Sequence, residues 1–199
     1  MIRILSSLKT ALVPSGRRPR TIRGGLFKGI RMELDLRCQT QLYLGLFERE
    51  LYPWIRKLSM GVRTAIDIGA GEGEYTLYFL TQTSAQVLAF EPCEDSRRRC
   101  LTNVALNVHD VDRSERFMLS SKYVGSVNGD ESLTLDSLLP LIRMPCLIKI
   151  DVDGGEVDIL TVRRICSDFR MCAGSSRLIP RNSSKAVSNF SAWLVSSQE

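Results

Sequence analysis

Three glycines placed directly after an apolar stretch are the residues most suggestive of chemistry. The segment TAIDIGAGEGEYTLYF, residues 64–79, places Gly69, Gly71 and Gly73 between a short strand and a new helix. Glycine allows a sharp turn and lets a ligand approach the backbone amides closely, and the first turn of a helix carries unpaired N–H groups. A strand, a glycine turn and a helix in this order predict a nucleotide-binding corner.

A carboxylate lies at or just after the end of each of three short apolar runs. Asp67 precedes the glycines, Glu91 follows the apolar run QVLAF, and Asp151 follows CLIKI. Glu91 comes about 20 positions after the first glycine, which is where such folds hold a ribose diol. Because the carboxyl ends of parallel strands meet at one edge of a sheet, we expect these side chains and the glycine turn to share one site.

Alternating strands and helices must position these residues. The predicted strands span 64–68, 86–91, 116–119 and 146–150, and the predicted helices span 73–81 and 94–107. This order predicts an α/β fold with a doubly wound, mostly parallel sheet. A small hairpin at 21–36 and a helical segment at 39–58, broken or restarted at Pro53, should precede the sheet. Asp136 should cap a short helix before the last strand.

The chain divides into three predicted parts. Residues 1–60 form a basic N-terminal arm, the small hairpin and covering helices, residues 61–160 form the nucleotide-binding core, and residues 161–199 form an anomalous tail. The first 32 residues are rich in Lys and Arg and contain no acidic residue. Such an arm either contacts an anionic surface or is a solvated leader, and the second interpretation is the more common one.

Composition restricts the remaining possibilities. The chain has 199 residues, 44% of them hydrophobic, and no run approaches the roughly 18 apolar residues of a membrane span. The six cysteines include no CxxC pair and His109 is the only histidine, so we expect no metal site. Reduced thiols favour a cytoplasmic location. No specific contact with nucleic acid is expected.

The order of motifs resembles the FkbM family of S-adenosylmethionine-dependent methyltransferases. The resemblance covers about residues 31–160 and rests on DIGAGEGEYT, AFEP, the pair Asn103 and Asn107, LTLDSLL and LIKIDVDGGEVDIL. It implies a class I methyltransferase fold, the cofactor S-adenosylmethionine, and O-methylation of a hydroxyl on a sugar, glycan or natural product.

The resemblance also implies a role for each position. The turn contacting the methionine part of the cofactor would comprise Asp67, Gly69, Ala70, Gly71 and Gly73. Glu91 would bind the ribose hydroxyls, the segment 119–121 with Ser120 would approach the adenine, and Asp151 would lie closest to the sulfonium. Asn103 and Asn107 are expected on a helix surface or at a helix end.

The chemistry of methyl transfer fits these positions. Transfer from a sulfonium is an in-line displacement, which holding donor and acceptor in line can largely catalyse. A hydroxyl acceptor also benefits from a base, and Asp151 is the predicted carboxylate for this role. Lys149 should lie on the same face as Asp151, because side chains alternate along a strand. Asp151 could equally be a cofactor-side or fold-stabilising carboxylate.

The tail after Leu160 departs from the family pattern. It is rich in Arg, Ser and Cys and has no hydrophobic period, as expected of coding DNA read out of frame. We therefore expect a truncated sheet, a weakly ordered tail and an inactive product. Two alternative functions follow: a methyltransferase-like protein that binds a partner without catalysis, and an NAD-type oxidoreductase. The second would need a G-x-G-x-x-G run, whereas this chain has GAGEG.

Overall fold

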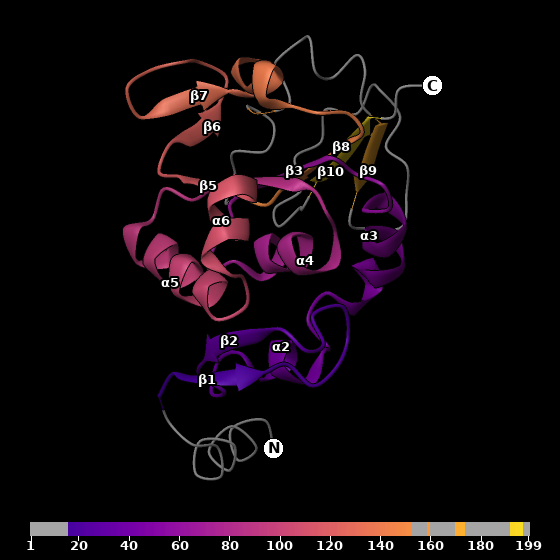
Figure 1. Ribbon diagram of the computed structural model, residues 1–199, viewed down its shortest axis with the longest axis vertical. Helices are drawn as coiled ribbons and strands as arrows, with labels where there is room; N and C mark the ends of the chain where they lie inside the picture. The colour runs from indigo at the N-terminus through magenta and orange to yellow at the C-terminus, as the bar shows by residue number, and fades with distance from the viewer. Residues whose placement is uncertain (1–15, 153–158, 160–169, 174–191, 197–199) are drawn as a thin grey trace, which may run out of the picture.

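The computed structural model describes residues 16–152, 159, 170–173 and 192–196, and its centre is a six-stranded sheet (Figure 1). The sheet has the order β5-β4-β3-β8-β10-β9. Its strands are β3 (Thr64–Ile68), β4 (Gln86–Phe90), β5 (Phe117–Ser120), β8 (Cys146–Ile150), β9 (Arg170–Ala173) and β10 (Ala192–Ser196). β3, β4, β5 and β8 run parallel to one another, while β10 is antiparallel to both β8 and β9.

The strand order confirms the predicted doubly wound α/β class. The chain starts in the middle with β3, moves outward through β4 and β5, and then crosses to β8 on the other side of β3. Ile68 is level with Phe90 on one side and Ile150 on the other, and Phe90 is level with Ser120. The carboxyl ends of the four parallel strands therefore form one even edge, where such folds bind their ligands.

Helices and short strands connect these strands. The connecting elements are α4 (Glu74–Gln82), α5 (Glu94–Ala105), α6 (Asp110–Arg116), β6 (Tyr123–Gly125), β7 (Ser132–Thr134) and the 3-10 helix η2 (Leu135–Leu141). The predicted helices correspond to α4 and α5, whereas α6 was not predicted. The prediction for Asp136 was wrong, because η2 is capped by Thr134, whose hydroxyl accepts a hydrogen bond from the Ser137 amide.

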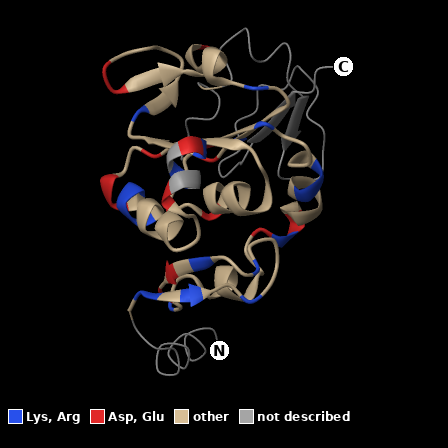
Figure 2. Cartoon of the chain, viewed as in Figure 1, with Lys and Arg blue, Asp and Glu red and all other residues tan. Residues whose placement is uncertain are grey.

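The N-terminal segment is a hairpin followed by short helices. Its elements are β1 (Arg18–Thr21), β2 (Arg31–Leu34), α2 (Thr40–Leu44), the 3-10 helix η1 (Arg49–Leu51) and α3 (Tyr52–Leu58). The hairpin begins slightly earlier than predicted, and Pro53 lies in the first turn of α3, where its missing N–H costs nothing. Figure 2 shows basic residues, in blue, along β1 and β2. The rest of the arm, residues 1–15, lies outside the described residues.

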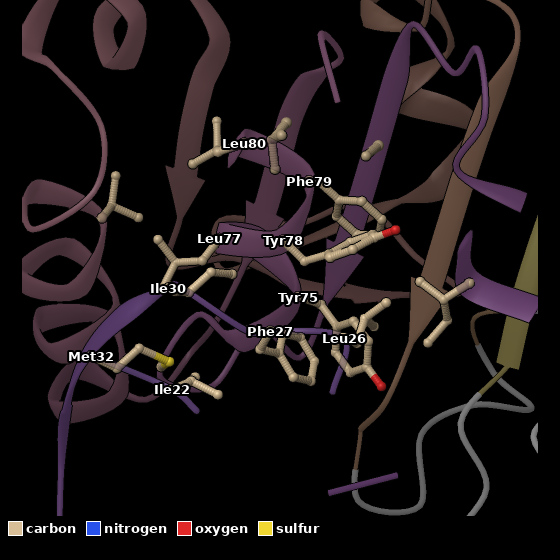
Figure 3. Packing of buried hydrophobic residues seen from close by; sticks show 14 of the residues in the cluster. Ile22, Leu26, Phe27, Ile30, Met32, Tyr75, Leu77, Tyr78, Phe79 and Leu80 are labelled. Atoms are coloured by element: carbon tan, nitrogen blue, oxygen red, sulfur yellow. The ribbon is translucent and has the colours of Figure 1, made fainter. Parts of the chain in front are cut away.

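The hydrophobic core has one cluster on each side of the central sheet. The first joins the N-terminal segment, α4 and α5 to the sheet, and the second joins η2 to the opposite face. In the first cluster, Phe27 is fully buried beneath α4 (Figure 3). Its ring meets those of Tyr75, Tyr78 and Tyr52 edge-on, at centroid distances of 5.2, 6.3 and 6.3 Å. This packing fixes the N-terminal segment against the helix that follows the glycine turn.

The tail contributes two strands to the sheet. β10 pairs along the whole of β8, from Ala192 opposite Ile150 to Ser196 opposite Cys146, and β9 pairs with β10. For these two segments the structure shows strands where weak order was predicted, and the outer edge of β8 is covered. The remainder of 161–199 lies outside the described residues, so the frame change stays a prediction.

Candidate functional site

The glycine turn packs tightly between the end of β8 and helix α5. Gly69, Gly71 and Gly73 all have positive φ, at +74°, +56° and +96°, a region that side chains disfavour. A Cβ on Gly69 would lie 1.9 Å from the backbone oxygen of Asp151, and one on Gly73 would lie 2.8 Å from the sulfur of Cys100. At Gly71 the nearest atom would be 3.8 Å away. The tip of the turn is therefore open, while both of its sides are closed by packing.

Glu91 ties the tip of this turn to the end of β4. One carboxylate oxygen accepts a hydrogen bond from the Gly71 amide and the other from the Cys93 amide, both at 2.8 Å. Glu91 is only 9% exposed. A carboxylate has about four acceptor sites, so Glu91 can hold the turn and still accept bonds from a ligand diol. The structure brings Glu91 and the turn together, as predicted.

Ser120 lies beside Glu91 at the end of the neighbouring strand. The Glu91 amide donates to the Ser120 carbonyl at 3.0 Å, and the Ser120 hydroxyl accepts from the Lys122 amide at 3.2 Å. Ser120 is half-buried. The predicted ribose and adenine positions are thus adjacent at the carboxyl edge.

Asp67 lies beneath the turn rather than facing a ligand. Its side chain is fully buried and accepts a hydrogen bond from the Thr76 hydroxyl at 2.7 Å. Its other oxygen is 3.2 Å from the Lys149 ammonium. The predicted contact between Asp67 and the cofactor is therefore corrected: Asp67 supports the turn from below.

Lys149 connects Asp67, the turn and Asp151. Its ammonium donates to the Gly69 carbonyl at 2.9 Å and lies 3.5 Å from a carboxylate oxygen of Asp151. Burial lowers the pKa of Lys149, but Asp67 and Asp151 outweigh this effect and raise the pKa overall. Lys149 therefore stays charged and is not a base. The prediction that Lys149 and Asp151 share a face is confirmed.

Asp151 is the most accessible carboxylate of this group, with 45% of its side chain exposed. Its amide donates to the Ile68 carbonyl at 3.0 Å, which continues the pairing of β3 and β8 into the turn. The backbone of Asp151 is therefore held at the carboxyl edge of the sheet next to Gly69, while the predicted role of its carboxylate stays a prediction.

Glu48 joins this cluster from the N-terminal segment and was not predicted. Its carboxylate accepts a hydrogen bond from the hydroxyl of Tyr75 on α4, and the Tyr75 ring lies 5.3 Å from the Lys149 ammonium. Burial and Asp151 raise the pKa of Glu48, partly opposed by the bond from Tyr75. Burial and Glu48 likewise raise the pKa of Tyr75, which stays protonated as a donor. The sequence carries no local signal for Glu48, because a loop places it there.

Two glutamates of the turn have opposite environments. Glu72 pairs with Arg17 and Arg99 at 2.5 and 3.0 Å, and accepts a hydrogen bond from Gln39. Burial would raise the pKa of Glu72, but these partners outweigh it and lower the pKa. Glu74 begins α4, and burial raises its pKa to about 7. The N-terminal segment therefore holds the turn from outside through Glu72.

Asn103 and Asn107 bind the backbone of β2 and the turn: Asn107 lies just past the end of α5, which is one of the two predicted places, whereas Asn103 is buried in the last turn of α5 rather than exposed on its surface. Asn103 is fully buried; its oxygen accepts from the Glu33 amide at 2.8 Å and its amide donates to the Glu72 carbonyl at 2.9 Å. Asn107 pairs with the backbone of Arg31 in both directions. These two side chains give β2 the hydrogen bonds that a neighbouring strand would supply.

A cavity of about 500 Å³ lies away from this site, at the other end of the strands. Its lining includes Val62, just before β3, and Ser84, just before β4, together with Lys28, Arg56 and Tyr78. The described residues contain no group of three or more His, Cys, Asp or Glu side chains that could hold a metal ion. Within the same part of the chain, no helix has the length and apolarity needed to cross a membrane.

No family model matches the chain, and no curated protein matches it significantly by sequence. Among solved structures it is similar to a provisionally assigned methyltransferase from Escherichia coli, at 12% identity and a TM-score of 0.46 over 92% of this chain and 100% of that one. Pyrococcus horikoshii TYW2 in complex with MeSAdo is similar at 12% identity and a TM-score of 0.42, over 92% of this chain and 70% of that one. The plantazolicin methyltransferase BpumL in complex with SAH is similar at 13% identity and a TM-score of 0.40, over 75% of this chain and 82% of that one. At these low scores, function must be argued from the site itself.

Proposed function

We propose that the chain is an S-adenosylmethionine-dependent methyltransferase that methylates a hydroxyl of a sugar, glycan or natural product. The observation that carries the proposal is the bridge from Glu91 to the Gly71 amide, because a carboxylate at the open tip of a glycine turn supports the binding of a ribose diol there. The sequence resemblance to the FkbM family supports the hydroxyl acceptor. A cytoplasmic location and contact between the basic arm and an anionic surface belong to the same proposal.

The residues present fit this cofactor. Glu91 retains acceptor capacity for ribose hydroxyls, and the side of Gly71 that a Cβ would occupy is open. Ser120, at the end of β5, is placed to approach the adenine, while Gly69, Ala70 and Gly73 shape the turn against the methionine part. When bound, the cofactor would supply an electrophilic methyl group on a sulfonium.

The chain's own residues would orient the acceptor hydroxyl. Asp151 is held at the edge of the sheet beside Gly69 and exposes nearly half of its side chain. A carboxylate there favours a cationic sulfonium by charge and can hydrogen-bond an acceptor hydroxyl. Lys149 keeps Asp151 and the turn in fixed relation, so that donor and acceptor can be held in line.

The test is calorimetric titration with S-adenosylmethionine, with S-adenosylhomocysteine and with NAD. The wild-type chain should bind the first two and not NAD. Glu91→Ala removes hydrogen bonds from a charged acceptor, each about 1.5–3 kcal/mol, so its affinity for both should fall at least about tenfold.

Asp95→Ala is the matched control, because Asp95 is an exposed carboxylate close in sequence, and among the described residues it forms an ion pair only with Arg98. It should leave cofactor affinity unchanged. Binding of NAD in place of S-adenosylmethionine would indicate the oxidoreductase alternative. Cofactor binding without transfer to any hydroxyl compound would indicate the partner-binding alternative.

A further inference from the structure

Glu48 has an unusual backbone for a residue with a side chain. Its φ and ψ are 49° and 38°, in the left-handed region, and no other non-glycine residue in the described ranges has a positive φ. This conformation is strained for a side chain larger than glycine. A glycine at this position would relieve the strain, so the presence of glutamate directs attention to its carboxylate.

The carboxylate of Glu48 has one oxygen fixed and the other available. The Tyr75 hydroxyl donates to Oε2, while Oε1 has no hydrogen bond to any described residue. Glu48 is half-buried rather than enclosed in the core. The Tyr75 ring is itself fixed by its edge-on packing with Phe27. A preoriented carboxylate, one of whose oxygens is hydrogen-bonded by no described residue, suits a group that receives a proton.

The neighbours of Glu48 place it at the ligand edge. On α4 it contacts Tyr75, and it is within electrostatic range of Lys149 on β8, of Asp151 just after β8 and of Glu50 on η1. Burial, the largest effect, keeps the pKa of Glu48 raised together with Asp151 and Glu50, although the hydrogen bond from Tyr75 and the charge of Lys149 oppose it. Asp151 differs, because Lys149 lies 3.5 Å from its carboxylate. Two carboxylates in different environments can divide two roles.

We propose that Glu48 is the base that accepts the proton of the acceptor hydroxyl, with Tyr75 as its positioning residue. This rests on the proposed function. The acceptor oxygen forms a bond to the methyl carbon, the sulfur–methyl bond breaks with its electron pair remaining on sulfur, and the hydroxyl proton moves to Glu48 Oε1 and then to water. Asp151 is left to hold Lys149 and to lie beside the sulfonium.

The test needs no knowledge of the acceptor. Sinefungin resembles S-adenosylmethionine but carries an amine at the methyl position, whereas S-adenosylhomocysteine carries nothing there. The ratio of their dissociation constants therefore reports negative charge near the transferred methyl. Glu48→Gln should bind S-adenosylhomocysteine as the wild type does. Its preference for sinefungin over S-adenosylhomocysteine, measured as the ratio of the two dissociation constants, should fall about tenfold.

Glu50→Gln is the matched control, since it removes a neighbouring exposed carboxylate and should keep the preference. Tyr75→Phe keeps the ring but frees Glu48, so the preference should fall partway. If Glu48→Gln binds neither compound, the same two dissociation constants are measured for Glu48→Asp, which keeps the charge. A wild-type ratio in Glu48→Asp supports the proposal, and a lost preference for sinefungin overturns the proposal.

The outcomes separate the two proposals. An unchanged ratio in Glu48→Gln overturns the role of Glu48 and leaves the methyltransferase proposal intact. A wild-type chain that binds neither compound overturns both.

Discussion

The two faces of the same central strands carry opposite chemistry. Toward the carboxyl ends of the strands one face is apolar, with Ile66 and Ile68 from β3, Leu88 and Phe90 from β4, and Ile148 and Ile150 from β8. The other presents Asp67 and Lys149 as level partners on β3 and β8, followed by Asp151. Because side chains alternate across a strand, one face can stabilise the sheet while the other positions charge at the ligand edge.

The charged face is tolerated because its charges compensate one another. The Lys149 ammonium has three oxygen neighbours, one each from Asp67, Gly69 and Asp151. Asp67 also accepts a hydrogen bond from the Thr76 hydroxyl. A buried charge is costly unless it is paired and hydrogen-bonded, so each member of the cluster depends on the others.

The largest expected effect comes from breaking this compensation. Lys149→Met keeps the side-chain length but leaves Asp67 buried without a counter-charge, so the free energy of unfolding should fall by about 3–5 kcal/mol. Urea unfolding followed by circular dichroism measures this. The double variant Asp67→Asn with Lys149→Met should recover part of the loss. A single variant as stable as the wild type would show that the pair does not carry the charged face.

A smaller effect is expected where the N-terminal segment joins that face. Asn103→Ala leaves the Glu33 amide and the Glu72 carbonyl without their partner, and should lower the free energy of unfolding by about 2 kcal/mol. Asn107→Ala is the control, because Asn107 is less buried and its loss should cost about 1 kcal/mol. Equal losses in both variants would contradict a special role for Asn103 at the turn.

The pH dependence of stability should reveal Glu74. Its pKa is about 7 in the folded chain, against an ordinary value of 4.5. Between these values the unfolded chain binds fewer protons than the folded chain, so stability falls as pH rises from about 4.5 to 7. Glu74→Gln should remove this slope, as urea unfolding at pH 5, 6 and 7 would show. Identical slopes in the two proteins would mean that Glu74 titrates normally.

Much of the apolar face and the turn could be predicted because their signals are local. The strands 64–68 and 146–150 match the structure as predicted, since short apolar runs bounded by glycine or acidic residues allow little else. Glu91 and the glycine turn were also brought together as expected, because strand order fixes which ends meet.

The parts of the charged face that were missed depend on contacts distant in sequence. Glu48 reaches Tyr75 from a loop, and Asn103 reaches Glu33 through the packing of β2 against α5. Asp67 was expected to face a ligand, but the sequence does not show that Lys149 and Thr76 would occupy its oxygens. Local patterns predict elements, whereas such contacts require the elements to be assembled.

The smallest effect is expected on the apolar face. Ile148 is fully buried in β8, one position before Lys149, and Ile148→Val removes a single methylene from the cluster beneath η2. Such a change costs about 0.5–1.5 kcal/mol through lost burial and a small cavity.

Ligand affinity should distinguish the two faces. Because Ile148 points away from Asp67 and Gly69, the affinity of Ile148→Val for S-adenosylhomocysteine should stay unchanged. Lys149→Met should weaken this affinity, because it releases the Gly69 carbonyl. Calorimetry on both variants, at a temperature where both are folded, makes the comparison. A larger loss of affinity in Ile148→Val than in Lys149→Met would mean that the two faces do not divide stability and ligand positioning between them.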